Sequence, residues 1–369
     1  MKKYLEKKAI CQPWHFNKKP ENENYSFIIV IPSYREGSQI IPTLKSISKQ
    51  IKINFSSILV IVVINNSANS PIEYFKDNQS TLNCIINSKY NFELVIVDAF
   101  YKNPLPRKKA GVGLARKIGF DLSLEYANQK TILISLDADT LIKENYLFIL
   151  KSYFVKGIYH CIIPGIYHQK ANNKNEENAI RNYEKFLYST AENLVNSRSP
   201  YGFITMGSAM TFTKNCYIKA GGIPPKKATE DFYFLQEVVK TSSVISINEK
   251  LIFPSSRPSN RVYLGTGFRI SQAINGQNLS NLYYSDESFH ILKNWLKIGG
   301  NGFNNTMEEI LSDAKVINPK LPEFLIKNKI KNIWKGLQNS CNNKDRFYHQ
   351  FNCWFDGLKT HRLLKYFSN

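Results

Sequence analysis

The stretch FIIVIPSYRE, from Phe27 to Glu36, opens with five apolar residues and then turns polar. A run that is apolar at every position, rather than at every second one, is typical of a strand buried on both faces, as in a parallel sheet. Three further runs have the same character and are rich in valine and isoleucine: Ile58–Ile64, Glu93–Val97 and Thr131–Leu136. The sequence therefore predicts a mostly parallel sheet.

Helix-like stretches separate these runs. One covers residues 38–51, and another covers residues 111–126, where Leu114, Ile118 and Leu122 recur every fourth residue on one face. Strands that alternate with helices predict an α/β, doubly wound fold with helices on both faces of the sheet. In such folds ligands bind beyond the carboxyl ends of the strands. The polar residues that follow the apolar runs are therefore the first site candidates: Pro32, Tyr34, Glu36, Asn65, Asn66, Asp98, Asp137 and Asp139.

Asp137 and Asp139 follow the strand expected at Thr131–Leu136. Two carboxylates two residues apart can hold one divalent cation that also binds phosphate oxygens, and Mg²⁺ and Mn²⁺ favour such hard oxygen ligands. The alternative is that Asp139 caps a helix beginning near Lys143. We expect the metal site, because the pair lies at the carboxyl end of a strand.

A basic, glycine-containing segment precedes the second helix and includes Lys109, Gly111, Gly113 and Arg116. Glycines allow a ligand to approach the backbone, and the start of a helix offers free N–H groups to an anion. A dinucleotide fingerprint is disfavoured, because the third glycine is missing. The remaining alternative is a solvated basic helix start.

Glu230 and Asp231 open a later helical stretch, and a carboxylate there could act as a general base. The alternative is the ordinary preference for acidic residues at a helix start. Further on, Arg257 and Arg261 stand four residues apart before a Gly-Thr-Gly turn. They could clamp a diphosphate, or they could be surface arginines that flank Pro258.

Composition limits the class of protein. The 369 residues are 43% hydrophobic, and 49 basic against 29 acidic residues give a formal charge of +20. This charge implies a polyanionic partner, such as a nucleotide, a phospholipid or a nucleic acid. No apolar run approaches the ~20 residues that a membrane span needs. The basic start has no apolar core behind it and the six cysteines form no CxxC pair, so we expect no secretory signal and a reducing cytoplasm.

The expected organisation has three parts. Residues 1–24 form a basic lead-in, residues 25–270 form the α/β domain, and residues 271–369 form a helical C-terminal extension. Within the domain, residues 168–200 look like an insertion or lid. Strands are also expected near Ile204 and at residues 244–247 and 251–253.

Two features of the C-terminal part suggest other sites. Residues 322–337 have an apolar face and separate lysines, so this basic amphipathic helix either packs on the α/β domain, which we favour, or lies on an anionic membrane. Zinc-capable residues also occur there, but their spacing fits no usual zinc motif, and we expect no zinc site: Cys341, His349, Cys353 and His361.

Taken together, these motifs resemble those of the family 2 glycosyltransferases, which have the GT-A fold. The opening strand through Glu36 is similar to the hydrophobic-P-x-Y/F-N-E start of that family. The segment from Gly111 to Arg116 is similar to its G-x-x-x-A-R, and the Asp137 pair is similar to its D-x-D. Residues 220–223, followed by Glu230 and Asp231, are similar to its G-G-F and E-D motifs.

The resemblance implies an inverting hexosyltransferase-type enzyme that takes sugar from a UDP- or GDP-linked donor and uses Mn²⁺ or Mg²⁺. The loop after Pro32 would hold the nucleotide. Asp137 would face the ribose or base, Asp139 the metal and diphosphate, and Asp231, with Glu230 beside it, would be the base. The acceptor would be a glycan or lipid-linked molecule of the cell envelope, met in the cytoplasm or at the inner face of the membrane.

The sequence departs from the family at three places. Asn65 and Asn66 stand where the family usually has aspartates that help to read the base, so UDP and GDP both stay open. Lys117 stands where the family often has asparagine. The family's metal-binding histidine has no clear counterpart, and His290 is only the nearest downstream histidine.

Other functions are less well supported. A nucleotidyltransferase on a related sheet would also use an aspartate pair and a metal ion. A non-catalytic relative that binds nucleotide would keep the fold. Nucleic-acid binding is disfavoured, because the basic residues are scattered rather than interleaved with aromatic residues on one face.

Overall fold

The computed structural model describes residues 2–259 and 265–368. The chain divides into two compact units. The first unit comprises residues 1–181 and 205–277, and the second comprises residues 182–204 and 278–369. The first division therefore falls within the long helix α6 (Lys174–Asn196).

In the described residues, the first unit contains an eight-stranded sheet with the order β3-β2-β1-β4-β7-β6-β8-β5. Four of the pairings are parallel, including both neighbours of the central strand β1, and the expected mixed α/β fold is confirmed. The pairings of β7 and of β5 are antiparallel. The strands are β1 Phe27–Ser33, β2 Ile58–Asn65, β3 Glu93–Ala99, β4 Ile132–Ser135, β5 Leu141–Ile142, β6 Cys161–Ile166, β7 Met210–Thr213 and β8 Val244–Phe253.

The apolar runs explain the centre of the sheet. Every residue of β1, β2 and β4 is buried, as expected for strands covered on both faces. Strand β1 pairs in register with β2 from Phe27 opposite Ile58 to Ser33 opposite Ile64. The carboxyl ends of these strands, and the residues that follow them, therefore lie at one edge of the sheet.

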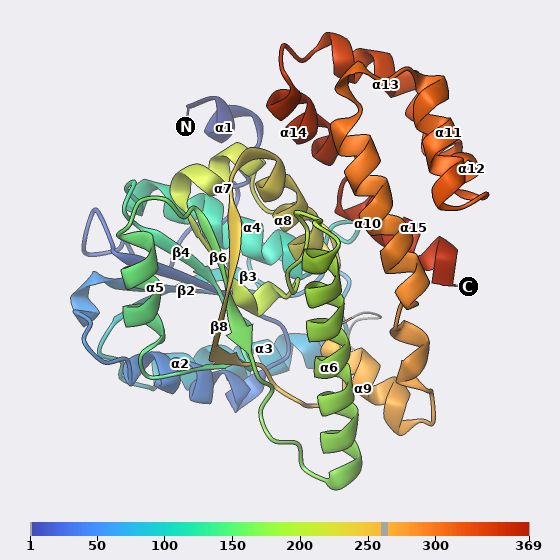
Figure 1. The fold of residues 1–369 in the computed structure, drawn as a ribbon. Helices are drawn as coiled ribbons and strands as arrows, with labels where there is room; N and C mark the ends of the chain where they lie inside the picture. The colour runs from blue at the N-terminus through green and yellow to red at the C-terminus, as the bar shows by residue number, and fades with distance from the viewer. Residues whose placement is uncertain (1, 260–264, 369) are drawn as a thin grey trace. The chain divides into compact units, whose positions relative to one another are not determined.

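Helices cover both faces of this sheet. Figure 1 shows α2 and α3 on one side and α4, α7 and α8 on the other. Helix α4 packs closely on β1, since a Cβ added at Gly119 would lie 2.5 Å from a methyl carbon of Val30. The helices of this unit are α1 Lys2–Lys7, α2 Ile40–Ser48, α3 Ile72–Ile86, α4 Val112–Ser123, α5 Tyr146–Phe154, α7 Lys214–Ala220, α8 Glu230–Thr241 and α9 Thr266–Ile274, together with the start of α6.

The basic lead-in packs on the first unit. Phe16 forms an antiparallel bridge with Val97 at the edge strand β3, and the side chain of Asn17 accepts from the Ile96 N–H at 2.7 Å. Trp14 is buried, and its Nε1 donates to the carbonyl of Asn103 at 2.7 Å. The segment thus covers a sheet edge that would otherwise expose unpaired backbone groups.

A buried polar cluster joins α1 to α4. The carboxylate of Asp121 accepts from the Tyr4 hydroxyl at 2.7 Å, the Tyr217 hydroxyl at 2.8 Å and the Ile10 N–H at 2.7 Å. Lys117 completes the cluster, with its Nζ 3.0 Å from Asp121 and 2.9 Å from the Tyr4 hydroxyl. Lys117 is therefore a structural partner of Asp121 inside the fold.

Two strand predictions need correction. Ile204 lies in no strand; it precedes a short helical turn, and the strand begins only at Met210. The segments expected at residues 244–247 and 251–253 form one strand, β8. The polar residues between them stay in the strand because their side chains are exposed, which breaks the apolar pattern without breaking the strand.

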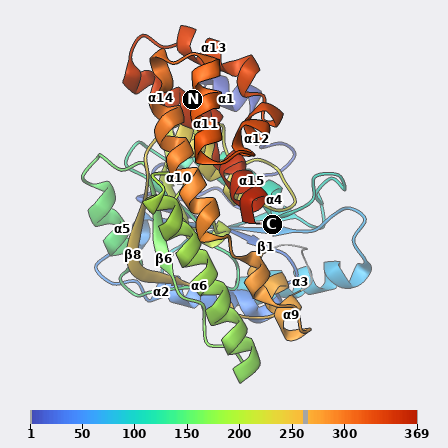
Figure 2. The same ribbon diagram turned by 45° about the vertical axis from the view of Figure 1, so that its right-hand side comes forward.

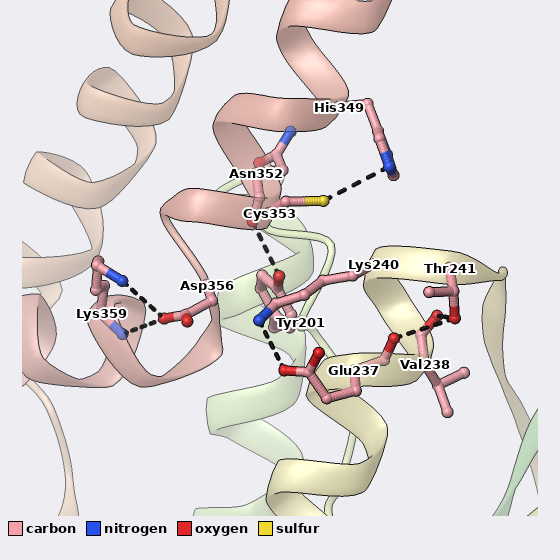
Figure 3. A network of polar contacts seen from close by, with 10 residues as sticks. All are labelled: Tyr201, Glu237, Val238, Lys240, Thr241, His349, Asn352, Cys353, Asp356 and Lys359. Atoms are coloured by element: carbon pink, nitrogen blue, oxygen red, sulfur yellow. Dashed lines mark hydrogen bonds and ion pairs between the residues drawn. The ribbon is translucent and has the colours of Figure 1, made fainter. Parts of the chain in front are cut away.

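The second unit is helical, as expected for the C-terminal part. Its core includes Leu194 from α6 together with Trp295, Trp334, Phe347 and Phe351. Figure 3 shows two of its polar contacts: the Tyr201 hydroxyl donates to the Asn352 carbonyl at 2.9 Å, and Lys359 pairs with Asp356. Its further helices, labelled in Figure 2, are α10 Asp286–Asn301, α11 Met307–Ile317, α12 Leu321–Lys327, α13 Ile330–Asn339, α14 Lys344–Trp354 and α15 Gly357–Ser368.

Residues 322–337 do not form the single amphipathic helix that the sequence predicts. The chain breaks between α12 and α13 at Lys329, which has a φ of 67°. Ile330, Trp334 and Leu337 are buried in the core of the second unit. Most of the apolar face expected for residues 322–337 is thus buried within this unit, whereas Ile326 is exposed. None of the described helices combines the length and apolar character needed to cross a membrane.

The zinc-capable residues of the C-terminal part do not converge. Cys353 contacts His349 at 3.5 Å, as Figure 3 shows, whereas His361 contacts the hydroxyl of Tyr284. Cys341 is buried in the apolar core. Over residues 2–259 and 265–368, no three histidine, cysteine or acidic side chains gather in a way that could hold a metal ion.

Candidate active site

The Asp137–Asp139 turn follows β4 directly at the carboxyl edge of the sheet. The Thr43 hydroxyl, from α2, donates to the Ala138 carbonyl at 2.9 Å and fixes the middle of the turn. The side chain of Asp137 is 37% exposed and that of Asp139 is 25% exposed, while Ala138 is buried. The turn therefore presents both carboxylates at the surface, and the α5 helix begins only at Tyr146, too far on for Asp139 to cap it.

Arg116 joins this turn to the Glu230 region. Its guanidinium, on α4, is almost fully buried and binds the carboxylates of Asp137 and Glu230. Burial alone would lower the pKa of Arg116, but the negative charges of Asp137 and Glu230 outweigh it and raise that pKa. The guanidinium thus stays charged and holds two sequence motifs together.

Glu230 and Asp231 begin α8. Burial raises the pKa of Glu230 to about 7, against the opposing effect of Arg116, and the nearby charge of Asp231 adds to the rise. Burial likewise raises the pKa of Asp231, with Arg116 opposing and Asp137 contributing. Burial thus favours the protonated form of both Glu230 and Asp231, and the charge of Arg116 opposes it in each case.

The two acidic residues differ in what they can do. Glu230 is buried against Arg116, whereas Asp231 is partly exposed and accepts from the Phe232 N–H at 2.8 Å. Thr229, just before them, has a φ of 64°, which is strained for a β-branched residue. Asp231 is therefore the more exposed carboxylate of the two, and Glu230 is the one that contacts Arg116.

A second arginine serves the other side of the turn. Nη2 of Arg257, in the segment after β8, lies 2.9 Å from the Glu36 carboxylate and 3.3 Å from that of Asp139. The structure therefore brings Glu36, Asp139 and Arg257 together. The spacing of these residues in the sequence does not indicate this contact. Arg261, the other half of the predicted clamp, lies outside the described residues.

The glycines at the start of α4 allow the segment that contains Lys226 and Lys227 to pack closely against this helix. A Cβ at Gly111 would lie 2.6 Å from the Cα of Lys227, and one at Gly113 would lie 2.5 Å from the Lys226 carbonyl oxygen. The Gly113 N–H donates to that carbonyl at 3.2 Å. Lys109, before the helix, is exposed. The glycines thus allow the loop that leads into Glu230 to approach α4.

Asn65 and Asn66 are buried, and their amides hold strand ends. The Asn65 side chain donates to the Ser33 carbonyl at 2.9 Å and to the Val63 carbonyl at 3.1 Å. Asn78 of α3 donates to the Asn66 side chain at 2.7 Å and accepts from the Arg35 N–H at 3.0 Å. These amides therefore position the loop that carries Glu36.

The remaining residues of that loop lie at the same edge. Pro32 is the buried sixth residue of β1. Tyr34 is partly exposed, and its ring meets the Tyr74 ring edge-on at a centroid distance of 6.0 Å. The guanidinium of Arg35 lies 3.9 Å above the Tyr74 ring. An aromatic and cationic surface therefore adjoins Glu36. His290 lies on α10 of the second unit.

Several residues of the site were not predicted. Gly207 makes room for Arg116, because a Cβ there would lie 2.3 Å from Nη2 of the guanidinium. Thr43, Asn78 and Gln169 act through hydrogen bonds to backbone carbonyls of distant segments. No spacing or residue pattern signals such contacts, because their partners are chosen by the fold and not by neighbouring residues.

The carboxylates suit a hard divalent cation. Glu36 and Asp139 both reach the same nitrogen of Arg257, so their oxygens converge on one small region. Mg²⁺ usually takes one or two carboxylates and completes its shell with substrate phosphates and water. Glu36 and Asp139 are therefore the two carboxylates here that could serve as ligands of such a cation.

Comparisons with known proteins give structural likeness only. No protein-family profile and no curated protein sequence matches the chain. TarS residues 1–349 from S. aureus, solved with UDP-GlcNAc, are 15% identical over 91% of each chain, with a TM-score of 0.49. The mannosyltransferase PcManGT from Pyrobaculum calidifontis, solved with GDP-Man and Mn²⁺, is 13% identical over 96% of this chain and 91% of its own, with a TM-score of 0.42.

Proposed function

We propose that this protein is an inverting glycosyltransferase of the family 2 type, which transfers a sugar from a UDP- or GDP-linked donor to an acceptor hydroxyl. The observation that carries the proposal is Arg116, which binds both Asp137 and Glu230 and so unites the D-x-D and E-D motifs in one site. Asp231, beside them, is partly exposed and can receive a proton.

The proposed reaction is a single displacement. The acceptor oxygen attacks the anomeric carbon, the bond from that carbon to the diphosphate oxygen breaks, and Asp231 takes the acceptor's proton. Arg116 keeps Asp137 and Glu230 in place during this step. Arg257 carries positive charge at Glu36 and Asp139, on the side of the turn where we place the diphosphate.

A divalent cation held by Asp139 and Glu36 would neutralise charge on the departing diphosphate. Asp137, the other predicted ligand, is bound to Arg116 and is proposed to face the ribose or base. Lys109, Tyr34 and the loop after Pro32 would contact the nucleotide. Asn65 and Asn66 would act through the shape of that loop, since their amides hold backbone carbonyls.

The first experiment is a donor screen. Purified protein is incubated with UDP- and GDP-sugars, with and without Mn²⁺, and release of nucleoside diphosphate is measured. We expect one donor class to be hydrolysed or transferred. Release of pyrophosphate instead would indicate nucleotidyl transfer, and binding without turnover would indicate a non-catalytic relative.

The second experiment tests the base. Asp231→Asn should lower turnover by ~10²–10⁴-fold while the affinity for the donor nucleotide changes little. Glu287→Gln is the matched control, because Glu287 occupies the same position in the first turn of α10 and so reports the loss of a carboxylate at a helix start. Normal turnover in Asp231→Asn would remove that residue from the mechanism.

The acceptor class is a separate part of the proposal. A cell-envelope glycan or a lipid-linked acceptor follows from the resemblance described above. An acceptor screen with soluble oligosaccharides and with lipid-linked sugars in detergent would separate the two, since only the true class should raise the rate above that of donor hydrolysis.

A further inference from the structure

One side chain ties together the backbones of the two segments that meet at Asp139. Nε2 of Gln169 donates to the Asp139 carbonyl at 2.9 Å and to the Phe253 carbonyl at 2.8 Å. The Gln169 backbone N–H donates to the Pro254 carbonyl at 2.9 Å. All three bonds lie within the first unit.

The two segments also meet through their side chains. Arg257 follows Phe253 by four residues, and its guanidinium lies 3.3 Å from the Asp139 carboxylate. The amide of Gln169 therefore fixes, from the backbone side, the two pieces of chain whose side chains form this ion pair. We propose that Gln169 is a positioning residue that sets the distance between Asp139 and Arg257.

Gln169 is itself held firmly. The neighbouring Tyr167 N–H donates to the Ile252 carbonyl at 2.9 Å. Arg181, near the middle of α6, donates to the His168 carbonyl at 2.8 Å and stacks over the Tyr167 ring at 3.9 Å. A side chain on such a braced segment can hold its partners within the narrow tolerances that a binding site needs.

The two hydrogen bonds made by Gln169 require a side-chain amide at this position. A single –NH₂ group offers two donors, and each meets one carbonyl oxygen here. Methionine has a similar length but no donor, so it would leave both carbonyls without this partner. Asparagine keeps both donors but is one methylene shorter, so it cannot reach both carbonyls together. These two variants separate loss of the donors from loss of reach.

The first test is a double-mutant cycle on folding. Gln169→Met, Arg257→Gln and the double variant are unfolded in urea. If Gln169 acts on the Asp139–Arg257 pair, the two effects are non-additive, by at least about threefold in the unfolding equilibrium constant. Additive effects would overturn the proposal. Gln169→Asn replaces Gln169→Met in the same cycle if the latter does not fold.

Gln50 supplies the matched control. Its Nε2 also donates to two backbone carbonyls, those of Lys143 at 2.8 Å and Ser46 at 3.3 Å, and neither is a carbonyl that Gln169 binds. Gln50→Met should lower stability, but its effect should add to that of Arg257→Gln. Coupling of equal size for both glutamines would mean that the effect is a general loosening of the unit, and would contradict the proposal.

The second test concerns catalysis and rests on the proposed function. In the wild-type background, Gln169→Met should lower kcat/KM for the donor by about 10–100-fold, as expected when a charged group is misplaced. In the Arg257→Gln background the same change should have little further effect. An equal loss in both backgrounds would overturn the positioning role. If the wild-type protein turns over no sugar nucleotide, the proposed function fails, and the folding cycle still decides the role of Gln169.

Discussion

The guanidinium of Arg116 binds the carboxylate of Glu230, although the two residues are 114 positions apart in the chain. The same guanidinium binds Asp137. Because Arg116 and Glu230 are both buried, their contact is shielded from solvent, and losing it leaves a buried charge without its partner. Asp231 is next to Glu230 in the chain. Its position thus depends on Arg116, which lies on a helix far away in the sequence.

Arg116→Lys keeps the positive charge of the side chain but removes the planar guanidinium that binds two carboxylates. One ammonium cannot bind two carboxylates as a guanidinium does, so we expect kcat/KM to fall by about 100-fold and the free energy of unfolding to fall by about 1–3 kcal/mol. Steady-state kinetics and urea unfolding measure these effects. Arg346→Lys, at an exposed position of α14, is the control and should change neither quantity. Full activity in Arg116→Lys would mean that the bridge is not needed.

Gly207→Ala should disturb the site through Arg116. The added methyl would lie 2.3 Å from the guanidinium, which must shift away from Asp137 or Glu230. We expect activity to fall by at least about tenfold. Gly336→Ala is the control, because its Cβ would meet nothing within 4 Å and the change lies within a helix, where alanine is favoured by ~1 kcal/mol. An active Gly207→Ala enzyme would show that Arg116 has room to move.

Glu230 should make stability depend on pH. Its pKa is raised from 4.5 to about 7, so the folded protein binds this proton more tightly than the unfolded chain. The resulting stabilisation, up to about 3 kcal/mol, is complete below pH 4.5 and is lost as the pH rises through about 7. Glu230→Gln should therefore flatten the plot of unfolding free energy against pH over this window. Parallel plots for variant and wild type would contradict the assignment.

Arg257 should compete with a divalent cation for Asp139 and Glu36. Removing a positive charge beside two carboxylates favours binding of another cation. Arg257→Gln should bind Mn²⁺ about tenfold more tightly in the absence of donor, and Asp139→Asn should bind it more weakly. Titration followed by electron paramagnetic resonance of free Mn²⁺ measures both. Unchanged affinity in both variants would place the cation elsewhere.

Tyr4→Phe tests whether the N-terminal segment supports the domain. The change removes the hydroxyl that donates to Asp121 and accepts from Lys117. We expect a loss of about 1–3 kcal/mol in unfolding free energy, because these partners are charged and buried. Tyr101→Phe is the control at an exposed site, where the hydroxyl has little to lose. Equal stability of the two variants would count against an anchoring role for Tyr4.

The sequence predicts most of the fold where burial leaves a strong pattern. Strands β1, β2, β3 and β4 correspond to the four apolar runs, and α4 lies where the spacing predicts a helix, although residues 113–121 are buried on every side and Leu122 only partly. The strand β7 is harder to recognise, because its four residues, Met210–Thr213, alternate polar and apolar and follow a turn. Tyr4 and Trp14 are aromatic residues within a lysine-rich segment, and only the structure shows that they are buried.

Part of the candidate site can also be predicted from the sequence. Charged residues at strand ends can be found from the sequence, and the structure brings Asp137, Glu230 and Arg116 into contact. The ion pair between Arg257 and Glu36 cannot be predicted from the sequence, because the two residues are 221 positions apart and belong to no common motif. Amide contacts such as that of Gln169 are hidden for the same reason.

The course of α6 has a practical consequence for dissecting the protein. Leu194, on this helix, belongs to the apolar core that α10 and the later helices complete. A version of the chain ending at residue 277 would keep Leu194 but lose the helices that bury it. The apolar surface exposed in this way would promote aggregation. Neither unit can be obtained by a single cut, so excision of the first unit requires replacing residues 182–204 with a short hydrophilic linker.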